Sequence, residues 1–480
     1  MKTLLKRILP TSKSLRAVSV LAGGNAAGQL AIILVSPILT RLYTPENFGV
    51  LAIYMSVTGI LSVIGCLRYE FAIPLPSAHT RAIDVSRLSL ICAIAVSFVT
   101  LITILLFRKN IAYSLDMPAL EKTLFFVPLG VLLLSIFKIL NMWCVRTEQY
   151  ILITTARLYQ VAASILVQLT LSKFGSLGLV FGQLANQGAG ISRLYQRFKT
   201  DTIEHKWNLK DIGTEALTYK RLPLFSTWAS LANKTSTQLP AITFAFAFDA
   251  VVVGFYALAM RIIATPGAMV GSSIQKVYLS HAAEHLRQNR LHSVFENAFT
   301  LLLTVMVPVT LLIALILPTL FQIMFGEEWK TAGEFGRWLM AVACCQVCIS
   351  PLMTTYTILG KQKQELKQQV IQFTLRLTSL LLGFYLGNPL IAVILYSCAS
   401  TAGYLIFLSW AYKTLKIPRL SLLILMTKAC LIALAINAPV IAAITLNKET
   451  DLLAPAIILS ALTIVLHSAK CLSPHFRSSK

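Results

Sequence analysis

Residues 299–325 read FTLLLTVMVPVTLLIALILPTLFQIMF and contain no Asp, Glu, Lys or Arg. A helix needs about 20 consecutive apolar residues to cross the hydrocarbon core of a bilayer. Of the 480 residues in the chain, 56% are hydrophobic and only 13% are charged, whereas soluble domains carry roughly 25% charged residues. The stretch therefore indicates a transmembrane helix, and the composition excludes a water-soluble domain.

Similar apolar stretches follow one another along almost the whole sequence. We predict an all-α fold, a polytopic transmembrane helical bundle of about 14 spans, each near the length that the bilayer requires. The longest polar segment is 196–221, and nothing else outside the membrane is long enough for a folded domain, so any function must reside in or beside the membrane. The predicted spans are residues 18–39, 47–66, 88–107, 120–142, 151–172, 175–195, 222–246, 250–272, 299–325, 335–359, 368–386, 389–411, 421–446 and 452–469.

The formal net charge of +23 reflects 42 Lys and Arg against 19 Asp and Glu. These basic residues are concentrated in alternate connecting segments, as the positive-inside rule requires of cytoplasmic loops. No basic stretch is interleaved with exposed aromatic residues, which argues against nucleic-acid binding. The apolar run 17–39 after the basic N-terminus is too long for a signal-peptide core. We therefore predict a multi-pass protein with both termini in the cytoplasm.

A short pattern recurs in the second half of the sequence. The motif Gly-x-x-Ala-x-x-Met at residues 49–55 returns at 254–260, an offset of 205 residues, and the same offset places Gln29 on Lys234. An even number of spans separates the copies, which predicts a parallel repeat about an axis normal to the membrane. The predicted organisation is an N-lobe with spans 1–6, a cytoplasmic inter-lobe loop, a C-lobe with spans 7–12, and spans 13–14 with a tail; these are residues 1–195, 196–221, 222–411 and 412–480.

The ionisable residues deep in the predicted spans are all basic. Burying a charge in lipid is costly, so such residues line water or face a partner, and a structural ion pair would supply both signs. We therefore predict a cavity that receives an anion from outside the chain. Two of these lysines lie near predicted cytoplasmic ends and can extend to the interface instead. The six residues are Arg157, Lys234, Arg261 and Arg376, with Lys138 and Lys428 near the span ends.

Polar stripes run along the first and the seventh predicted spans. With about 100° between successive helical residues, one face of each span is polar over most of its length. Two such faces predict a shared water-filled cavity. The alternative for each Ser or Thr is an interhelical hydrogen bond, worth about 0.6 kcal/mol on average. The stripes contain Asn25, Gln29, Ser36 and Thr40 on the first span, and Ser226, Ser230, Asn233, Lys234, Thr237 and Gln238 on the seventh.

Motifs that would indicate an enzyme or a metal site are weak. The nine cysteines lie mostly in apolar segments, where free Cys packs as a small hydrophobe, so no disulfide framework is predicted. Cys345-x-x-Cys348 has no second pair nearby. His281-Ala-Ala-Glu284-His285 matches a zinc-protease pattern but has no evident third ligand. With no P-loop and no G-x-S-x-G, we predict no enzymatic activity, no metal and no cofactor.

Three segments resemble one known family. Residues 40–76 (TRLYTPENFGVLAIYMSVTGILSVIGCLRYEFAIPLP) are similar to the opening signature of bacterial Wzx-type oligosaccharide flippases. Residues 251–284 (VVVGFYALAMRIIATPGAMVGSSIQKVYLSHAAE) resemble the segment that opens the second half of these proteins, and residues 325–335 (FGEEWKTAGEF) resemble their outer loop after span nine. This is the polysaccharide transport family of the multidrug/oligosaccharidyl-lipid/polysaccharide exporter superfamily, and the resemblance covers most of the first 12 spans.

The resemblance implies a fold, a substrate and a location. The fold is two six-helix lobes around a central cavity, plus two extra C-terminal helices, working by alternating access. The substrate is an undecaprenyl-pyrophosphate-linked oligosaccharide, moved from the cytoplasmic to the periplasmic leaflet of the bacterial cell inner membrane. The product serves surface polysaccharide biosynthesis: lipopolysaccharide O-antigen, capsule or exopolysaccharide. The implied partners are membrane lipids, the polysaccharide polymerase and its chain-length regulator.

Combined with the intramembrane cations, the resemblance suggests roles for individual residues. A pyrophosphate fits a set of cations, because Arg makes bidentate phosphate contacts and Lys acts as a point charge. We expect the cavity cations to be Arg261, Lys234, Arg157 and Arg376, with Arg68 receiving the head group near the cytoplasmic mouth. Contacts to sugar or bound water are expected from Asn25, Gln29 and Asn233. The residues that match the family's outer-end motif, and are expected to form a gate, are Arg41 and Glu46.

Two other functions share some of these features. An ion-coupled small-molecule exporter of the same superfamily would have the same fold, but an exporter of cationic drugs would need intramembrane carboxylates. A membrane glycan polymerase would need a large periplasmic loop with catalytic acids, whereas the longest predicted outer loop is only 326–334. As proton carriers, Glu70 and Asp249 are weak candidates near span ends. The sequence therefore favours the flippase.

Overall fold

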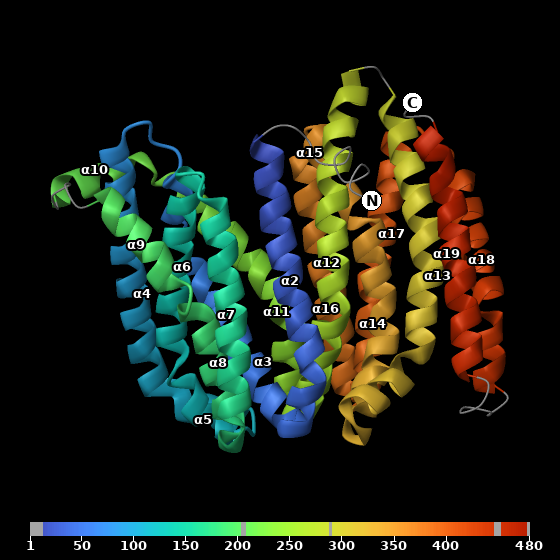
Figure 1. The fold of residues 1–480 in the computed structure, drawn as a ribbon, viewed down its shortest axis with the longest axis horizontal. Coiled ribbons are helices and arrows are strands. Elements are labelled where there is room, and N and C mark those ends of the chain that lie inside the picture. Colours follow the sequence, from blue (N-terminus) through green and yellow to red (C-terminus); the bar gives the residue numbers. More distant parts are fainter. Residues whose placement is uncertain (1–12, 203–207, 288–289, 446–452, 478–480) are drawn as a thin grey trace. The chain divides into compact units, whose positions relative to one another are not determined.

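The computed structural model of the chain describes residues 13–202, 208–287, 290–445 and 453–477 (Figure 1). Every regular element in these residues is a helix, and no strand occurs among them. A helix satisfies its own backbone hydrogen bonds, which the hydrocarbon core demands because it offers no water to N–H and C=O groups. The predicted all-α class is confirmed.

Nine helices in the described residues are long and apolar enough to cross a bilayer, or ten if the pair Glu327–Cys348 and Ser350–Ile358, bent by 41°, is one span. The chain is therefore a multi-pass membrane protein. Each predicted span overlaps between one and three consecutive helices. The hydropathy and length criterion nevertheless identifies fewer spans in the described residues than the predicted number of about 14. Polar residues lower the hydropathy of α11 (Thr227–Ala247) and α16 (Gln362–Tyr385), and α8 (Ser176–Gly188) is short.

The chain separates into two compact units, Met1–Ala257 and Leu258–Lys480. α12 (Ala250–Arg287) begins in the first unit. Before it, the first unit contains α2 (Lys13–Leu42), α3 (Pro45–Ile64), η1 (Tyr69–Ala72), α4 (His79–Ser114), α5 (Pro118–Leu124), α6 (Val127–Arg146), α7 (Tyr150–Thr170), η2 (Ser172–Phe174), α8, α9 (Ile191–Thr202), α10 (Leu209–Thr218), the π-helical turn η3 (Leu222–Ser226) and α11.

The second unit is built around α13 (Leu291–Phe325) and an aromatic core. Phe295 and Phe299 of α13 meet the Tyr412 ring of α17 (Pro389–Thr414) edge-on, with ring centroids 6.0 and 6.5 Å apart. The last two helices pack on α13, where Asn437 Nδ2 donates to the carbonyl of Pro308 (3.2 Å). The helices are α13 (Leu291–Phe325), η4 (Glu327–Trp329), α14 (Lys330–Cys348), η5 (Ser350–Thr354), α15 (Thr355–Ile358), α16, α17 (Pro389–Thr414), α18 (Arg419–Thr445) and α19 (Leu453–Arg477).

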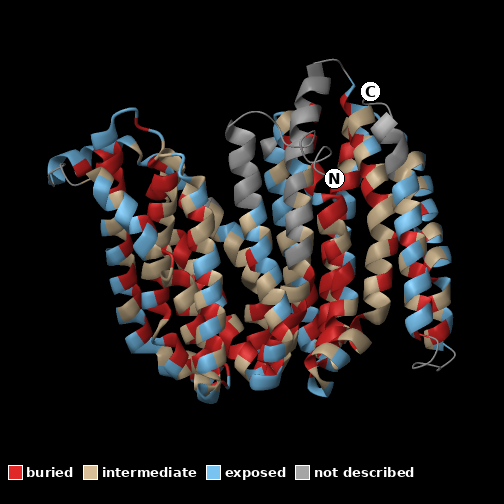
Figure 2. Cartoon of the chain, viewed as in Figure 1, coloured by how far each residue is buried: buried red, intermediate tan, exposed pale blue. Residues whose placement is uncertain are grey.

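Large apolar side chains point away from both cores. Ile94, Phe98 and Leu106 of α4 are all more than half exposed, as are Val465 and Leu466 of α19. Figure 2 shows exposed positions along the length of both helices. Apolar surface of this extent is unusual on a soluble monomer, but a bilayer solvates it. The faces identify the sides of α4 and α19 that contact lipid.

The segment predicted as a cytoplasmic loop, 196–221, contains the end of α9 and all of α10, and both helices pack on the first unit. Arg81 of α4 makes two hydrogen bonds with the Glu215 carboxylate of α10, at 2.5 and 3.2 Å. Trp143 Nε1 of α6 donates to Asp201 Oδ2 of α9 (3.0 Å). These contacts bind the segment to the first unit; its place as a separate region between lobes stays a prediction.

Candidate functional site

One face of α3 is polar and is covered by protein. The helix begins at Pro45, whose missing N–H matters little in a first turn. Farther along, Ser56 and Ser62 are 1% and 7% exposed, and Gly59 lies between them in sequence. Polar groups in a membrane interior need protein or water partners, so the neighbours of this face decide what it can do.

α11 packs along this face of α3. Ser56 Oγ donates to Gln238 Oε1 of α11 at 3.1 Å. One turn earlier on α11, Lys234 crosses Gly59: a Cβ at position 59 would lie 3.2 Å from Lys234 Cε and 3.7 Å from its Nζ. The missing side chain at position 59 therefore makes room for the stem of Lys234.

Lys138 of α6 reaches α3 one turn farther along. Its Nζ donates to the backbone carbonyl and to the hydroxyl oxygen of Ser62, the latter at 3.3 Å. Lys138 also interacts electrostatically with Glu70, Arg68 and Lys234. Although its sequence position suggested an extension to the membrane interface, its ammonium group is directed into the first unit.

A left-handed turn after α3 places Arg68. Leu67 and Arg68 have φ angles of 47° and 65°, a region that costs non-glycine residues about 1–3 kcal/mol each. The guanidinium carbon of Arg68 lies 4.1 Å from the centroid of the Phe71 ring, within cation–π range. Arg68 Nε is buried and has no hydrogen-bond partner among the described residues, which leaves it a donor for a further ligand.

Glu70 supplies a negative charge close to these cations. It lies in η1, is 1% exposed, and its Oε2 has no hydrogen-bond partner in the part of the chain that the structure describes. Burial raises the pKa of Glu70, and the charges of Lys138 and Arg68 oppose that rise. The expectation that the cations would have no carboxylate nearby is therefore not met at Lys138.

We call Arg68, Lys138 and Lys234 the α3 cation cluster. Lys138 interacts with the other two cations and with the Glu70 carboxylate, and Glu70 also interacts with Arg68, so positive charge is in excess within this group. Such a cluster can hold an anion, because Arg offers a planar fork to phosphate and Lys a compact charge. Two of the expected substrate-binding cations, Arg68 and Lys234, are brought together here.

Arg157 of α7 belongs to a different contact. Its Nη1 donates to Asn25 Oδ1 of α2 at 2.6 Å, and its Nε is buried with no hydrogen-bond partner within the described segments. The helices approach closely because Gly24 packs directly against the Thr154 side chain. The contact joins two predicted site residues through a charge-assisted hydrogen bond, which is stronger than a neutral one.

The other two expected cations lie in the second unit. Arg376 Nε of α16 donates to Ser400 Oγ of α17 (3.1 Å), and its guanidinium carbon is 5.8 Å from the centroid of Tyr396. Arg261 lies on α12 and is partly buried. Their roles as cavity cations stay predictions.

The remaining expected residues lie on exposed positions. Gln29 of α2 and Asn233 of α11 are exposed, and their contact with a ligand stays a prediction. Arg41 lies in the last turn of α2 and Glu46 in the first turn of α3, where each charge is favourable to its helix dipole. Within the part of the chain that the structure describes, no ion pair joins them. The gate stays a prediction.

The sequence profile of a family described as polysaccharide biosynthesis protein matches residues 38–334, more than half of the chain. The chain belongs to the polysaccharide biosynthesis protein family. The matched segment includes α3, α6 and α11 and hence the whole α3 cation cluster. The family predicted from the sequence resemblance is confirmed.

Solved structures share the fold of this polysaccharide biosynthesis protein. Lipid II flippase MurJ in an inward closed conformation aligns with a TM-score of 0.71 and 12% identity, over 96% of this chain and 100% of that one. A multidrug resistance MATE family transporter of the MOP superfamily, inward-facing, aligns with a TM-score of 0.59 and 14% identity, over 81% and 94%. At these identities the likeness shows the fold alone. A comparison with curated protein sequences gives no match.

The sequence analysis did not place Lys138 or Glu70 in the substrate-binding site of this polysaccharide biosynthesis protein. Ser135, Lys138 and Asn141 recur every three residues on α6, a polar ridge that could have predicted a face covered by another helix. Glu70 offers no comparable signal. It follows a turn with two left-handed residues, and its electrostatic partner Lys138 comes from a helix remote in sequence.

No metal centre is evident in the described residues of this family member. No group of three or more His, Cys, Asp or Glu side chains there is placed to hold a metal ion. The side chains of the zinc-like pattern, His281, Glu284 and His285, lie outside the described residues. The cation cluster is therefore the feature from which a function can be argued.

Proposed function

We propose that this polysaccharide biosynthesis protein is a flippase that moves an undecaprenyl-pyrophosphate-linked oligosaccharide from the cytoplasmic to the periplasmic leaflet of the bacterial inner membrane. One observation carries the proposal: around α3, Lys138 interacts with Arg68, Lys234 and Glu70, so three cations gather with one carboxylate in these interactions among the described residues. In a protein of this family, the anion that such a cluster would bind is the pyrophosphate of the lipid-linked glycan.

The order of the cations along α3 suggests a path for the head group. Arg68 follows the end of the helix that the charge bias places on the cytoplasmic side. Lys138 meets α3 at Ser62, and Lys234 meets it at Gly59, about 5 Å farther along the axis. A pyrophosphate that enters from the cytoplasm would meet Arg68 first and then the two lysines.

The neutral polar residues complete the proposed site. Amide side chains both donate and accept hydrogen bonds, so Asn25, Gln29 and Asn233 suit sugar hydroxyls or the water around them. The lipid tail would stay in the bilayer.

The N-lobe and C-lobe would expose a central cavity to each side in turn, with Arg41 and Glu46 closing its outer end. The lysine and arginine bias favours cytoplasmic termini, and the polymerase and chain-length regulator would act on the delivered glycan.

The test follows the lipid-linked glycan in the native host. Arg68→Gln and Lys234→Gln remove one positive charge each, and Lys428→Gln removes an exposed lysine of α18 as a matched control. At equal protein levels, labelling of the glycan by a periplasmic reagent should fall about tenfold or more in the first two variants, the loss of roughly 1.4 kcal/mol of binding. The control should label like the wild type.

Depletion of the protein separates the flippase from other transporters. With polymerase and ligase intact, undecaprenyl-linked glycan should accumulate unlabelled on the cytoplasmic side. Normal labelling after depletion would reject the flippase and leave a small-molecule exporter as the explanation. Normal labelling in Arg68→Gln and Lys234→Gln alone would reject the cation cluster as the head-group site.

A further inference from the structure

The turn between α3 and η1 has a backbone conformation that its own residues do not favour. Leu67 and Arg68 are left-handed, with φ angles of 47° and 65°, and neither is a glycine. Such residues keep this conformation only where the surrounding structure fixes it. Because Arg68 is the residue expected to meet the head group first, whatever fixes the turn also sets the direction of its side chain.

Tyr69 connects this turn to α10. Its side chain is 6% exposed, and its hydroxyl donates to the backbone carbonyl of Ala216 at 3.2 Å. The last four carbonyls of an α-helix have no partner within the helix, and Ala216 lies among the last four residues of α10. The hydroxyl therefore caps the C-terminal end of α10, while the Tyr69 backbone belongs to η1 and directly follows Arg68.

Apolar packing holds the Tyr69 ring in place. Tyr69 forms a buried cluster with Leu88 of α4 and Ile212 of α10, and Leu67 of the same turn packs against this cluster. Leu67 and Tyr69 are therefore fixed by one set of contacts, and Arg68 lies between them in sequence.

α10 is itself bound to α4. Glu215, the residue before Ala216, is 4% exposed and makes two hydrogen bonds with Arg81, at 2.5 and 3.2 Å. A carboxylate bound by two N–H groups of one Arg is fixed in orientation as well as in distance. A path of hydrogen bonds thus runs from α4 through the end of α10 to Tyr69, so α10 supports the turn.

We propose that Tyr69 is a positioning residue, which holds the left-handed turn through Ala216 of α10 and thereby directs Arg68 toward the anionic head group. The inference rests on the proposed function, because it assumes that Arg68 binds the pyrophosphate. Consecutive side chains of a 3₁₀ helix diverge by about 120°, so Tyr69 can contact α10 while Glu70 interacts with Lys138. Tyr69 acts through Arg68 and does not touch the substrate.

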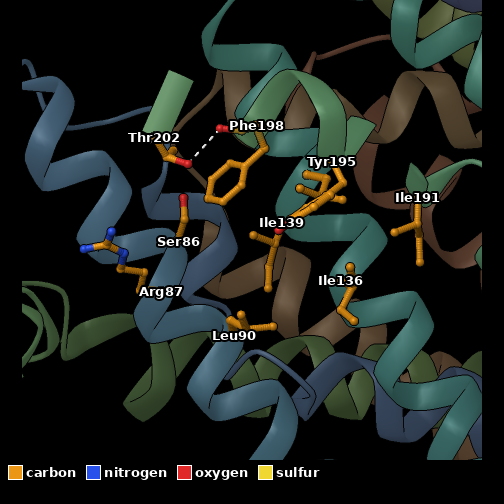
Figure 3. Close-up of a pocket in the computed structure, with 10 residues that line it drawn as sticks. Ser86, Arg87, Leu90, Ile136, Ile139, Ile191, Tyr195, Phe198 and Thr202 are labelled. Atoms are coloured by element: carbon orange, nitrogen blue, oxygen red, sulfur yellow. Dashed lines mark hydrogen bonds between the residues drawn. The ribbon is translucent and has the colours of Figure 1, made fainter. Parts of the chain in front are cut away.

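A matched control lies on the other side of α4. Tyr195 of α9 lines a cavity of about 540 Å³ between α4, α6 and α9, together with Ser86 and Leu90 of α4 (Figure 3). Leu90 lies about 200° around α4 from Leu88, so the cavity and the Tyr69 cluster lie on opposite faces of this helix. Tyr195→Phe removes the same hydroxyl from a half-exposed ring and should leave the turn unchanged.

Hydrogen exchange of the purified full chain tests whether Tyr69 holds the turn, whatever the substrate is. Tyr69→Phe removes the hydroxyl and keeps the ring, so the protein should fold. The backbone amides of residues 66–72 should exchange about fivefold faster than in the wild type, which corresponds to roughly 1 kcal/mol, the net contribution of one hydrogen bond. Tyr195→Phe should exchange like the wild type. Unchanged exchange in Tyr69→Phe would overturn the proposal.

Binding of undecaprenyl pyrophosphate to the solubilised protein tests whether the turn positions Arg68. Tyr69→Phe should weaken binding about fivefold, and Arg68→Gln about tenfold or more. In the Arg68→Gln protein, Tyr69→Phe should cause little further loss, because the group that it positions is gone. A merely structural role would weaken binding equally in both backgrounds, and such multiplying losses would overturn the positioning role.

The same titrations separate this inference from the proposed function. If Arg68→Gln binds undecaprenyl pyrophosphate like the wild type, the head-group site fails, and the positioning role fails with it. If Arg68→Gln binds weakly while Tyr69→Phe binds like the wild type, the head-group site stands and only the positioning role is overturned.

Discussion

Gly49 of α3 packs directly against the backbone carbonyl of Ala250 at the start of α12. Gly254 of α12 packs in the same way against the backbone carbonyl of Pro45 at the start of α3. The sequence offset of 205 residues relates Pro45 to Ala250 and Gly49 to Gly254. The contact is therefore reciprocal, as in a self-complementary two-fold interface.

The same offset relates the caps of the two helices. At the start of α3, Thr44 Oγ1 accepts from Asn47 N (3.5 Å), and at the start of α12, Asp249 Oδ1 accepts from Val252 N (2.8 Å). In both helices the side chain of the N-cap residue accepts a hydrogen bond from the backbone N–H three residues later. The two helix starts share their construction from the cap to the glycine contact.

Gly49→Ala should destabilise the protein by about 1–3 kcal/mol, the usual cost of overpacking. The new Cβ would overlap the Ala250 backbone, which cannot rotate aside as a side chain can. Thermal unfolding of the detergent-solubilised protein measures the loss. Gly23→Ala is the control, because nothing lies within 4 Å of a Cβ there. Equal melting temperatures for Gly49→Ala and wild type would contradict the close contact.

Gly49→Ala and Gly254→Ala should not be additive. Each substitution forces the same two helix starts apart, so the second one adds less than it costs alone. A double-mutant cycle should give a coupling of about 0.5–3 kcal/mol, as for residues that share one contact. A coupling near zero would mean that the two glycines act in separate interfaces.

Asn25→Ala and Arg157→Gln should be coupled in glycan export. If Arg157 is oriented by its bond to Asn25 (2.6 Å), each single variant should lower export and the double variant should be little worse than Arg157→Gln. Measuring export at equal protein levels tests this, with Thr154→Ser as a nearby control on the same interface. Independent, multiplying losses would show that Asn25 acts on the substrate without Arg157.

Glu70 should make the stability of the protein depend on pH. Because burial raises its pKa above the usual 4.5, the folded state binds more protons than the unfolded state between the two pKa values. Stability therefore falls as the pH rises from 4.5 through the folded pKa, and is level above it. Glu70→Gln should flatten this slope in thermal unfolding, whereas the exposed Glu328→Gln should retain it. A slope unchanged by Glu70→Gln would assign it to other groups.

The spans could be predicted from the sequence because lipid imposes length and apolarity on each one. The stretch 299–325 lies inside α13, and most other predictions overlap helices equally well. The breaks were harder to predict. The stretch 120–142 divides into α5 and α6, since Pro128 suits the first turn of a new helix, and 175–195 divides between α8 and α9. Hydropathy alone does not distinguish a broken helix from a continuous one.

The residues of the candidate site could be predicted only where the pattern that indicates them lies within a single helix. The stripe on α11 placed Lys234 on a polar face that was predicted to line a water-filled cavity, and such periodicity can be read within one helix. Which residue it would meet depends on packing between helices remote in sequence, and Gly59 has no feature that indicates a lysine partner. The same holds for Lys138 and Ser62. The α3 cation cluster therefore depends on how the helices pack. The sequence indicated only that basic residues lie within the spans.

Gly59 allows the position of Lys234 to be tested separately from folding. At Gly49 the obstacle to a Cβ is backbone, but at Gly59 it is the flexible end of the Lys234 side chain, 3.2 Å away at Cε. Gly59→Ala should therefore melt close to the wild type, because the lysine can move by a few tenths of an ångström. Gly59→Leu would displace Lys234 from α3 and should lower export as Lys234→Gln does. Combining Gly59→Leu with Lys234→Gln should add little further loss, since both remove the same charge from the same place. If Gly59→Leu exports normally while Lys234→Gln does not, Lys234 acts from a position away from Gly59. It would then not belong to the α3 cation cluster.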